Sequence, residues 1–185
     1  MSKAIFDFTF GLLLLILFSI LIFLCFLIAA IDTCSNGFFF QTRIGKNGKP
    51  FQIIKIKTIH PKKNTSSSFG KFLRKSKLDE LPQLWNVLCG AMSFVGPRPD
   101  LPGYYDKLTG ESRKILLLKP GITSEAALKY SNEEELLSKQ ENPKEFNDLV
   151  LFPDKVNMNL DYYYKHNLSK DIKIILMTLL PKFYN

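Results

Sequence analysis

The sequence is poor in residues that bind transition metals. It has three cysteines and two histidines among 185 residues, with no CxxC pair and no Cys/His cluster. Cys25, Cys34 and Cys89 are too few and too far apart to form a disulfide framework, which indicates a reducing compartment. We therefore expect neither a zinc site nor a disulfide-stabilised secreted fold.

Acidic residues are absent from one long stretch. Arg43 to Lys77 contains 11 lysines and arginines but no aspartate or glutamate, and the whole chain has a net charge of +8. An apolar run lies shortly before this basic block, an arrangement typical of the cytoplasmic flank of a membrane segment. Anionic lipid headgroups attract each basic residue near the surface by about 1 kcal/mol. We expect the block to contact membrane lipids. A nucleic-acid surface is the alternative, and we expect no nucleic-acid partner because the lipid is the nearer anion.

Charged residues and proline are both absent from Phe10 to Ile31, where 20 of 22 residues are apolar. A helix of this length reaches about 33 Å, enough to cross a hydrocarbon core of about 30 Å. The run is longer than the apolar core of a signal peptide, and no convincing cleavage site follows it. We predict that residues 1–32 form a permanent membrane anchor. Ser19, near its centre, can bond back to the helix backbone, so a re-entrant and a spanning helix both remain open.

The remaining residues, 33–185, are enough for one compact domain, and the basic flank of the apolar run predicts that this domain is cytoplasmic. Asn47-Gly48 predicts a hairpin, and alternation from Phe51 to Ile59 predicts a strand. Helices are predicted at 69–77, 82–88, 109–119, 132–139, 143–150, 154–165 and 171–183. These elements indicate an α/β (α+β) fold. It is a helix-dominated single domain with a small sheet, an N-terminal hydrophobic helix and surface amphipathic helices.

Two adjacent carboxylates, Asp79 and Glu80, lie where the helix that contains Pro82 is expected to begin. Acidic residues are common at helix starts as solvated charges. Here, however, the basic block ends directly before them, and Arg74 lies five residues before Asp79. Such a setting suits a divalent cation that holds a diphosphate, or a carboxylate that attacks phosphorus. The acid pair is therefore the leading candidate for chemistry, whereas Lys55 is interpreted as a surface charge.

Arg98 lies between Pro97 and Pro99, in a segment whose prolines exclude regular structure. A guanidinium on such a rigid loop is pre-organised to bind a phosphate with two hydrogen bonds. A structural role, as a clamp onto backbone carbonyls, is the alternative. The sequence contains no Walker or GxGxxG motif that would bind phosphate instead.

Three strings together resemble a known family: LDELPQLWNVL at 78–88, MSFVGPRP at 92–99 and KPGIT at 119–123. The sequence is similar over nearly its whole length to the bacterial sugar transferases, the small monotopic phosphoglycosyl transferases. The resemblance implies transfer of a sugar-1-phosphate from a UDP-sugar to polyprenol (undecaprenyl) phosphate, with release of UMP and a requirement for Mg²⁺. It also implies that residues 33–185 are the catalytic domain, which performs the first membrane step of bacterial glycan assembly at the cytoplasmic face of the inner membrane.

The resemblance also implies roles for individual residues. Asp79 would be the nucleophile, carrying a covalent phospho-sugar intermediate, and also a magnesium ligand; Glu80 would assist it. Arg74 matches an arginine that holds the polyprenol phosphate. Arg98, with its flanking prolines Pro97 and Pro99, matches a loop that shapes the nucleotide-sugar site.

The sequence departs from the family pattern at two informative places. The family's hydrophobic helix usually carries a Ser-Pro break, whereas here Ile20 follows Ser19. A late acid of the metal region is represented by Asp161, although alignment backward from Asp171 puts Asn159 at that position. Asp161 is kept as a candidate magnesium ligand.

Two alternatives to covalent catalysis remain open. In the first, Asp79 and Glu80 only hold magnesium while the lipid phosphate attacks the UDP-sugar directly. In the second, the chain is a non-catalytic scaffold on the membrane surface that binds anionic lipids through Arg43 to Lys77. The sequence does not identify the sugar.

Overall fold

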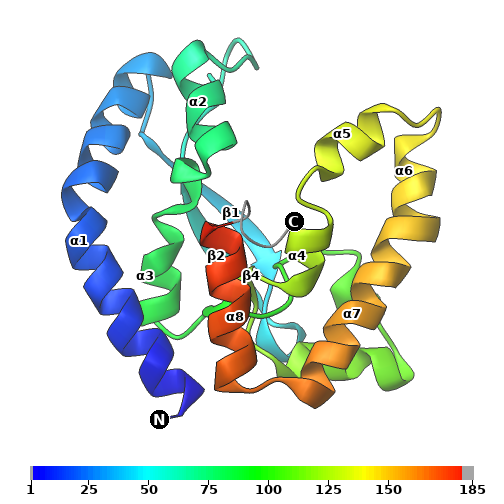
Figure 1. The fold of residues 1–185 in the computed structure, drawn as a ribbon. Coiled ribbons are helices and arrows are strands. Elements are labelled where there is room, and N and C mark those ends of the chain that lie inside the picture. The colour runs from blue at the N-terminus through cyan, green and yellow to red at the C-terminus, as the bar shows by residue number, and fades with distance from the viewer. Residues whose placement is uncertain (1, 181–185) are drawn as a thin grey trace. The chain divides into compact units, whose positions relative to one another are not determined.

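The computed structural model describes residues 2–180, and helices dominate them (Figure 1). The helix-dominated class and the long apolar N-terminal helix are confirmed. The described residues contain two two-stranded sheets where one small sheet was expected. The chain divides into two compact units. The first contains the residues up to Arg43 together with Pro50–Met92, and the second contains Ile44–Lys49 together with the residues from Ser93 onward.

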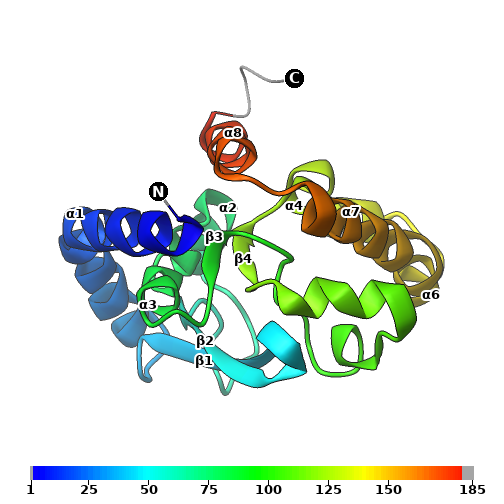
Figure 2. The ribbon, with the colours of Figure 1, turned by 90° about the horizontal axis from the view of Figure 1, so that it is seen from below.

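The first unit begins with α1 (Lys3–Asp32), a continuous helix of 30 residues. Its ribbon bends about half-way along (Figures 1 and 2). Near the middle, the Ser19 hydroxyl donates a hydrogen bond to the Ile16 carbonyl at 2.8 Å, a side-chain contact that often accompanies a helix bend. Within residues 2–180, α1 is the one helix long and apolar enough to cross a membrane.

Both halves of α1 pack against other elements of the first unit. In the N-terminal half, a Cβ atom on Gly11 would lie 3.5 Å from the side chains of Val87 and Leu88 in α3 (Gln83–Leu88). In the C-terminal half, Cys25 and Ala29 are buried in a cluster that also contains Ile56 and Leu73. α1 is therefore packed as part of the first unit.

The rest of the first unit follows the predicted pattern closely. β1 (Phe38–Ile44) and β2 (Pro50–Ile56) form the expected hairpin, connected through η1 (Lys46–Gly48). Asn47 and Gly48 both have positive φ there, 60° and 74°, as the tight turn requires. β2 ends three residues before the predicted Ile59. The amphipathic helix expected at 69–77 is α2 (Ser68–Ser76), and η2 (Leu78–Glu80) connects it to α3.

The second unit contains a sheet that the sequence analysis missed. β3 (Ser93–Val95) and β4 (Gly121–Thr123) pair in parallel, with Ser93 opposite Gly121 and Val95 opposite Thr123. η3 (Tyr105–Lys107) and η4 (Gly110–Leu117) lie between them in the chain. The helix predicted at 109–119 is present, but as the 3₁₀ helix η4.

The remaining helices are α4 (Glu125–Lys129), α5 (Glu133–Ser138), α6 (Pro143–Phe146), the π-helical turn η5 (Asn147–Leu151), α7 (Phe152–Lys165) and α8 (Leu168–Leu179). α4 was not predicted, although Ser124 caps it by accepting a hydrogen bond from the Ala127 amide at 3.0 Å. α8 packs against β3 (Figure 2). Residues 181–183 of the last predicted helix lie outside the described residues.

The core of the second unit gathers residues from distant parts of the sequence. Ile44, Ile115, Leu116 and Val156 are buried together with Tyr105. This unit also contains buried polar side chains that bond to each other, which offsets their loss of water. The Asn159 amide, for example, donates to the Tyr105 hydroxyl at 3.0 Å.

Candidate active site

The acid pair lies in η2, a single 3₁₀ turn between two helices of the first unit. Lys77 ends α2 in a left-handed conformation with φ of 58° and so turns the chain into η2. Pro82 then stands at the cap of α3. Asp79 and Glu80 thus lie just before the helix, rather than within its first turn.

Asp79 is buried without a full set of hydrogen bonds. The residue is 8% exposed, and its Oδ1 atom finds no partner within the described part of the chain. Burial raises the pKa of the Asp79 carboxyl, and the charge of Glu80 raises it further, whereas Lys55 and Lys77 act in the opposite direction. A buried acceptor without a partner is costly. Asp79 therefore offers a carboxylate oxygen that a cation or an electrophile could engage.

Glu80 has a different environment from its neighbour. Its Oε1 atom lies 2.9 Å from Nζ of Lys55, and the two side chains are only 11% and 18% exposed. The interpretation of Lys55 as a surface charge was therefore wrong: β2 carries it to the acid pair. The two adjacent carboxylates therefore differ. Oε1 of Glu80 is paired with Lys55, whereas Oδ1 of Asp79 has no hydrogen-bond partner among the described residues.

The chemistry of this pair fits magnesium. Among residues 2–180 there is no cluster of three or more His, Cys, Asp and Glu side chains that would form a complete protein cage for a metal. Mg²⁺ does not need one, because it commonly takes one or two carboxylates and completes its octahedron with water and substrate phosphates. The open Oδ1 of Asp79 is the donor atom that fits such a site.

Asp161 lies in α7, in the second unit, and its side chain is 46% exposed. It forms ion pairs with Lys165 and with Lys170, the latter at 3.9 Å. The hydrogen bond from Lys165 holds the pKa of Asp161 below its usual value. Asn159, the alternative at this position, is buried and committed to Tyr105. A role for Asp161 as a metal ligand stays a prediction.

The two predicted arginines lie in different units. Arg74 is exposed in the last turn of α2, close in sequence to η2. Arg98 is exposed between two buried prolines, Pro97 and Pro99. The rigid loop is held at Pro97, whose carbonyl accepts a hydrogen bond from the Gly121 amide at 2.9 Å.

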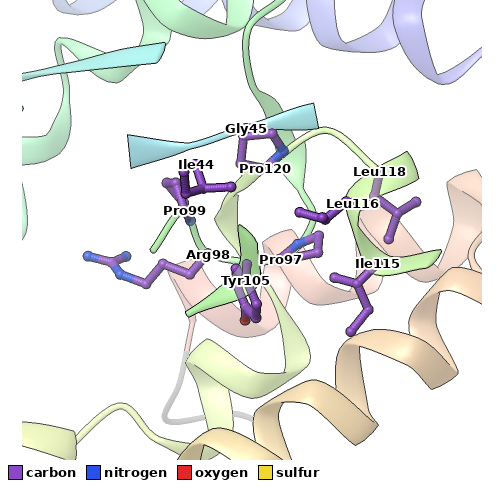
Figure 3. A pocket seen from close by; sticks show the side chains of 10 residues that line it. All are labelled: Ile44, Gly45, Pro97, Arg98, Pro99, Tyr105, Ile115, Leu116, Leu118 and Pro120. Atoms are coloured by element: carbon purple, nitrogen blue, oxygen red, sulfur yellow. The ribbon is translucent and has the colours of Figure 1, made fainter. Parts of the chain in front are cut away.

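Arg98 borders a small apolar pocket of the second unit (Figure 3). Its side chain extends away from the other lining residues, among them Tyr105, Ile115 and Leu116. The enclosed volume is ≈ 10 Å³, which holds about one water molecule. The pocket is therefore a packing feature beneath the loop, and Arg98 presents its guanidinium outside it.

Comparison with known proteins identifies the family. A family model described as bacterial sugar transferase matches residues 1–184. The chain belongs to the bacterial sugar transferase family. This confirms the resemblance seen in the three sequence strings and the assignment to sugar-phosphate transferases.

Several relatives of this sugar transferase have named activities. A UDP-glucose:undecaprenyl-phosphate glucose-1-phosphate transferase of Escherichia coli is 32% identical over 180 residues, covering 88% of this chain and 36% of the relative. An enzyme of the same name from Caulobacter vibrioides is 31% identical, covering 97% of this chain and 68% of the relative. A third relative, the uncharacterized sugar transferase EpsL of Bacillus subtilis, is 32% identical, covering 96% of this chain and 85% of the relative. The chain thus spans about a third of the E. coli relative and most of EpsL.

Sequence reasoning also missed Asn86 in this sugar transferase. Asn86 lies in α3 and is buried, and its side chain bonds to the backbone of β2 at two points. A buried asparagine in a short apolar helix gives little local signal, since its partners lie more than 30 residues away in the sequence.

Proposed function

We propose that this chain transfers a sugar-1-phosphate from a UDP-sugar to polyprenol (undecaprenyl) phosphate and releases UMP. The observation that carries the proposal is Asp79: a buried carboxylate with an open oxygen, beside a glutamate that a lysine holds. The named relatives, which act on UDP-glucose and undecaprenyl phosphate, support these substrates. In a cell, the reaction would begin the membrane-bound assembly of a bacterial glycan.

The reaction divides into two displacements at one phosphorus atom. In the first, the Asp79 carboxylate attacks the β-phosphorus of the UDP-sugar. A bond forms between the carboxylate oxygen and phosphorus, the bond to the bridging oxygen breaks, and UMP leaves with that electron pair. In the second, a phosphate oxygen of the polyprenol phosphate attacks the same phosphorus and releases the Asp79 carboxylate. The product is a polyprenyl-diphosphate sugar.

Binding groups for these substrates are available on the chain. Asp79 is the residue that would hold magnesium, which when bound neutralises charge on the diphosphate. Arg74 is proposed to contact the lipid phosphate, and Arg98 the nucleotide-sugar, because an exposed guanidinium can bind a phosphate with two hydrogen bonds. Glu80 is proposed to assist the nucleophile.

The membrane would hold the enzyme at its lipid substrate. Both halves of α1 contact the first unit, the N-terminal half at α3 and the C-terminal half at Ile56 and Leu73. A helix that crossed the bilayer would have one end far from this unit. The contacts at both halves, together with the bend, therefore support a re-entrant anchor. Phe72 and Trp85 are exposed on α2 and α3, as expected for side chains at a membrane interface. We propose the cytoplasmic face of the inner membrane as the location.

Release of UMP provides the direct test. The purified chain in lipid nanodiscs, with magnesium and polyprenol phosphate, is expected to release UMP from at least one member of a panel of UDP-sugars. Asp79→Asn should abolish turnover and also the protein-bound label obtained when the donor sugar is radioactive and the lipid is omitted. EDTA should abolish turnover as well, and added magnesium should restore it.

Each other outcome has a clear meaning. Near-normal turnover of Asp79→Asn would remove Asp79 as the nucleophile. Turnover without any labelled protein, and with ternary-complex instead of ping-pong kinetics, would favour direct attack by the lipid phosphate. Absence of UMP release with every donor would favour the lipid-binding scaffold.

A further inference from the structure

The ion pair between Lys55 and Glu80 joins two parts of the first unit that are 25 residues apart in sequence. Lys55 comes from β2 and Glu80 from η2, and both side chains are largely shielded from water. Removing two charges from water costs free energy that their attraction offsets only when the geometry is good. Such a pair is therefore a weak source of stability. Stability alone does not explain why a shielded ion pair lies beside Asp79.

The strand that carries Lys55 is itself fixed by a side chain from α3. β2 belongs to a two-stranded sheet, so only one of its edges is paired with a strand. On the other edge, the Asn86 side chain accepts a hydrogen bond from the Ile54 amide at 3.2 Å and donates one to the Gln52 carbonyl at 2.8 Å. A carboxamide offers the same donor and acceptor as a neighbouring strand. Asn86 thus attaches β2 to the helix that follows the acid pair.

We propose that Lys55 is a positioning residue for the transferase reaction, holding Glu80 in place beside Asp79, and that Asn86 fixes the strand from which Lys55 reaches. This inference rests on the proposed function. Lys55 occupies an oxygen of Glu80, whereas Oδ1 of Asp79 stays open. The two neighbouring carboxylates can therefore have different roles. Glu80 is held by the lysine, whereas Asp79 is available to attack the phosphorus atom and to bind the cation.

Substitution of Lys55 tests the role directly. Lys55→Met keeps the length of the side chain and removes its charge, and it should lower kcat for UMP release by about tenfold or more while KM for the UDP-sugar changes less than about twofold. Lys55→Arg should restore kcat to within about threefold of wild type. Lys139→Met is the matched control, because it removes the exposed Lys139–Glu135 pair, and it should leave turnover unchanged. A kcat of Lys55→Met within about twofold of wild type overturns the proposal.

A double-mutant cycle separates positioning from a general structural role. If Lys55 acts through Glu80, combining Lys55→Met with Glu80→Gln should cost no more turnover than Glu80→Gln alone. Losses that multiply would overturn the proposal. The same cycle measured by thermal unfolding needs no substrate, and no coupling between the two sites there would also overturn it. Inactivity of the wild type with every UDP-sugar would instead contradict the proposed function, so the two failures are distinguishable.

Discussion

Gly96 and Gly121 approach each other so closely that neither position has room for a side chain. A Cβ atom on Gly121 would lie 2.2 Å from the backbone nitrogen of Gly96, and one on Gly96 would lie 2.3 Å from the carbonyl oxygen of Lys119. These glycines lie at the short parallel pair of β3 and β4, next to the loop that contains Arg98. Their contact therefore sets where that loop leaves the sheet.

Replacement of Gly121 by alanine should destabilise the protein. The new methyl group must displace backbone atoms rather than a flexible side chain, so we expect the free energy of unfolding to fall by about 1–3 kcal/mol. Thermal unfolding in nanodiscs measures the change. Gly11→Ala is the matched control, because its Cβ would make ordinary contacts at 3.5 Å inside a helix where alanine is favoured. Equal losses for both variants would contradict the interpretation.

Asn86 should be sensitive to loss of its amide donor. Asn86→Asp keeps the size of the side chain but directs an oxygen toward the Gln52 carbonyl, which then loses its partner. Loss of this partly buried hydrogen bond should lower the free energy of unfolding by about 1 kcal/mol, which unfolding curves resolve. Asn167→Asp is the control: Asn167 caps α8 by accepting from the Lys170 amide at 2.9 Å, and aspartate caps a helix equally well. An unchanged unfolding midpoint for Asn86→Asp would exclude a role of this hydrogen bond in holding β2 to α3.

Local patterns account for the parts of the fold that the sequence predicted well. An uninterrupted apolar run gave α1, Asn47-Gly48 gave the hairpin turn, and apolar spacing gave α2 and α7. The parallel pair β3–β4 was missed because each strand has three residues and their pairing depends on segments 28 residues apart. A strand of three residues is too short to show a periodicity that could be recognised in the sequence.

In the candidate site, too, residues with a local sequence pattern were predicted, and those that depend on contacts between distant segments were missed. Asp79, Glu80 and Arg98 were selected as candidates from the sequence because their residue types and neighbours are unusual. Lys55 was not, since a lysine in an alternating strand looks like a solvated charge until the fold brings Glu80 to it. The sequence also did not decide whether α1 bends, because Ser19 without a following proline allows a bend but does not require one.

The buried acid at position 79 should make the protein less stable at neutral pH. Burial raises the folded-state pKa of Asp79 above its unfolded value. Between those two values the folded state binds more protons than the unfolded state, so stability falls as the pH rises through that window. Asparagine carries no charge, and Asp79→Asn should therefore raise Tm at about pH 7.5. At this chain length each 1 kcal/mol gained raises Tm by roughly 2–4 °C, which a thermal unfolding curve resolves.

The gain from Asp79→Asn should shrink as the pH falls below the unfolded-state pKa and should be lost below about pH 3, where the aspartate is protonated in both states. Asp161→Asn is the matched control. Lys165 holds the pKa of Asp161 below its usual value, so neutralising this side chain should not raise Tm at neutral pH. A fall in Tm for Asp79→Asn at neutral pH would mean that the charged carboxylate has a stabilising partner in the folded protein.

The bent α1 predicts that both of its ends lie on the same side of the membrane. Ser2 precedes the helix and the exposed Cys34 follows it. With Cys89 replaced by serine, a membrane-impermeant maleimide should label Cys34 and the Ser2→Cys variant together. Both should stay unlabelled in intact spheroplasts and react in inverted vesicles. Ser138→Cys, exposed in α5, reports the side that the second unit occupies and should behave identically. Labelling of Ser2→Cys from the outside, with Cys34 protected, would show that α1 spans the bilayer, and the packing of Gly11 against α3 could not then persist in the membrane.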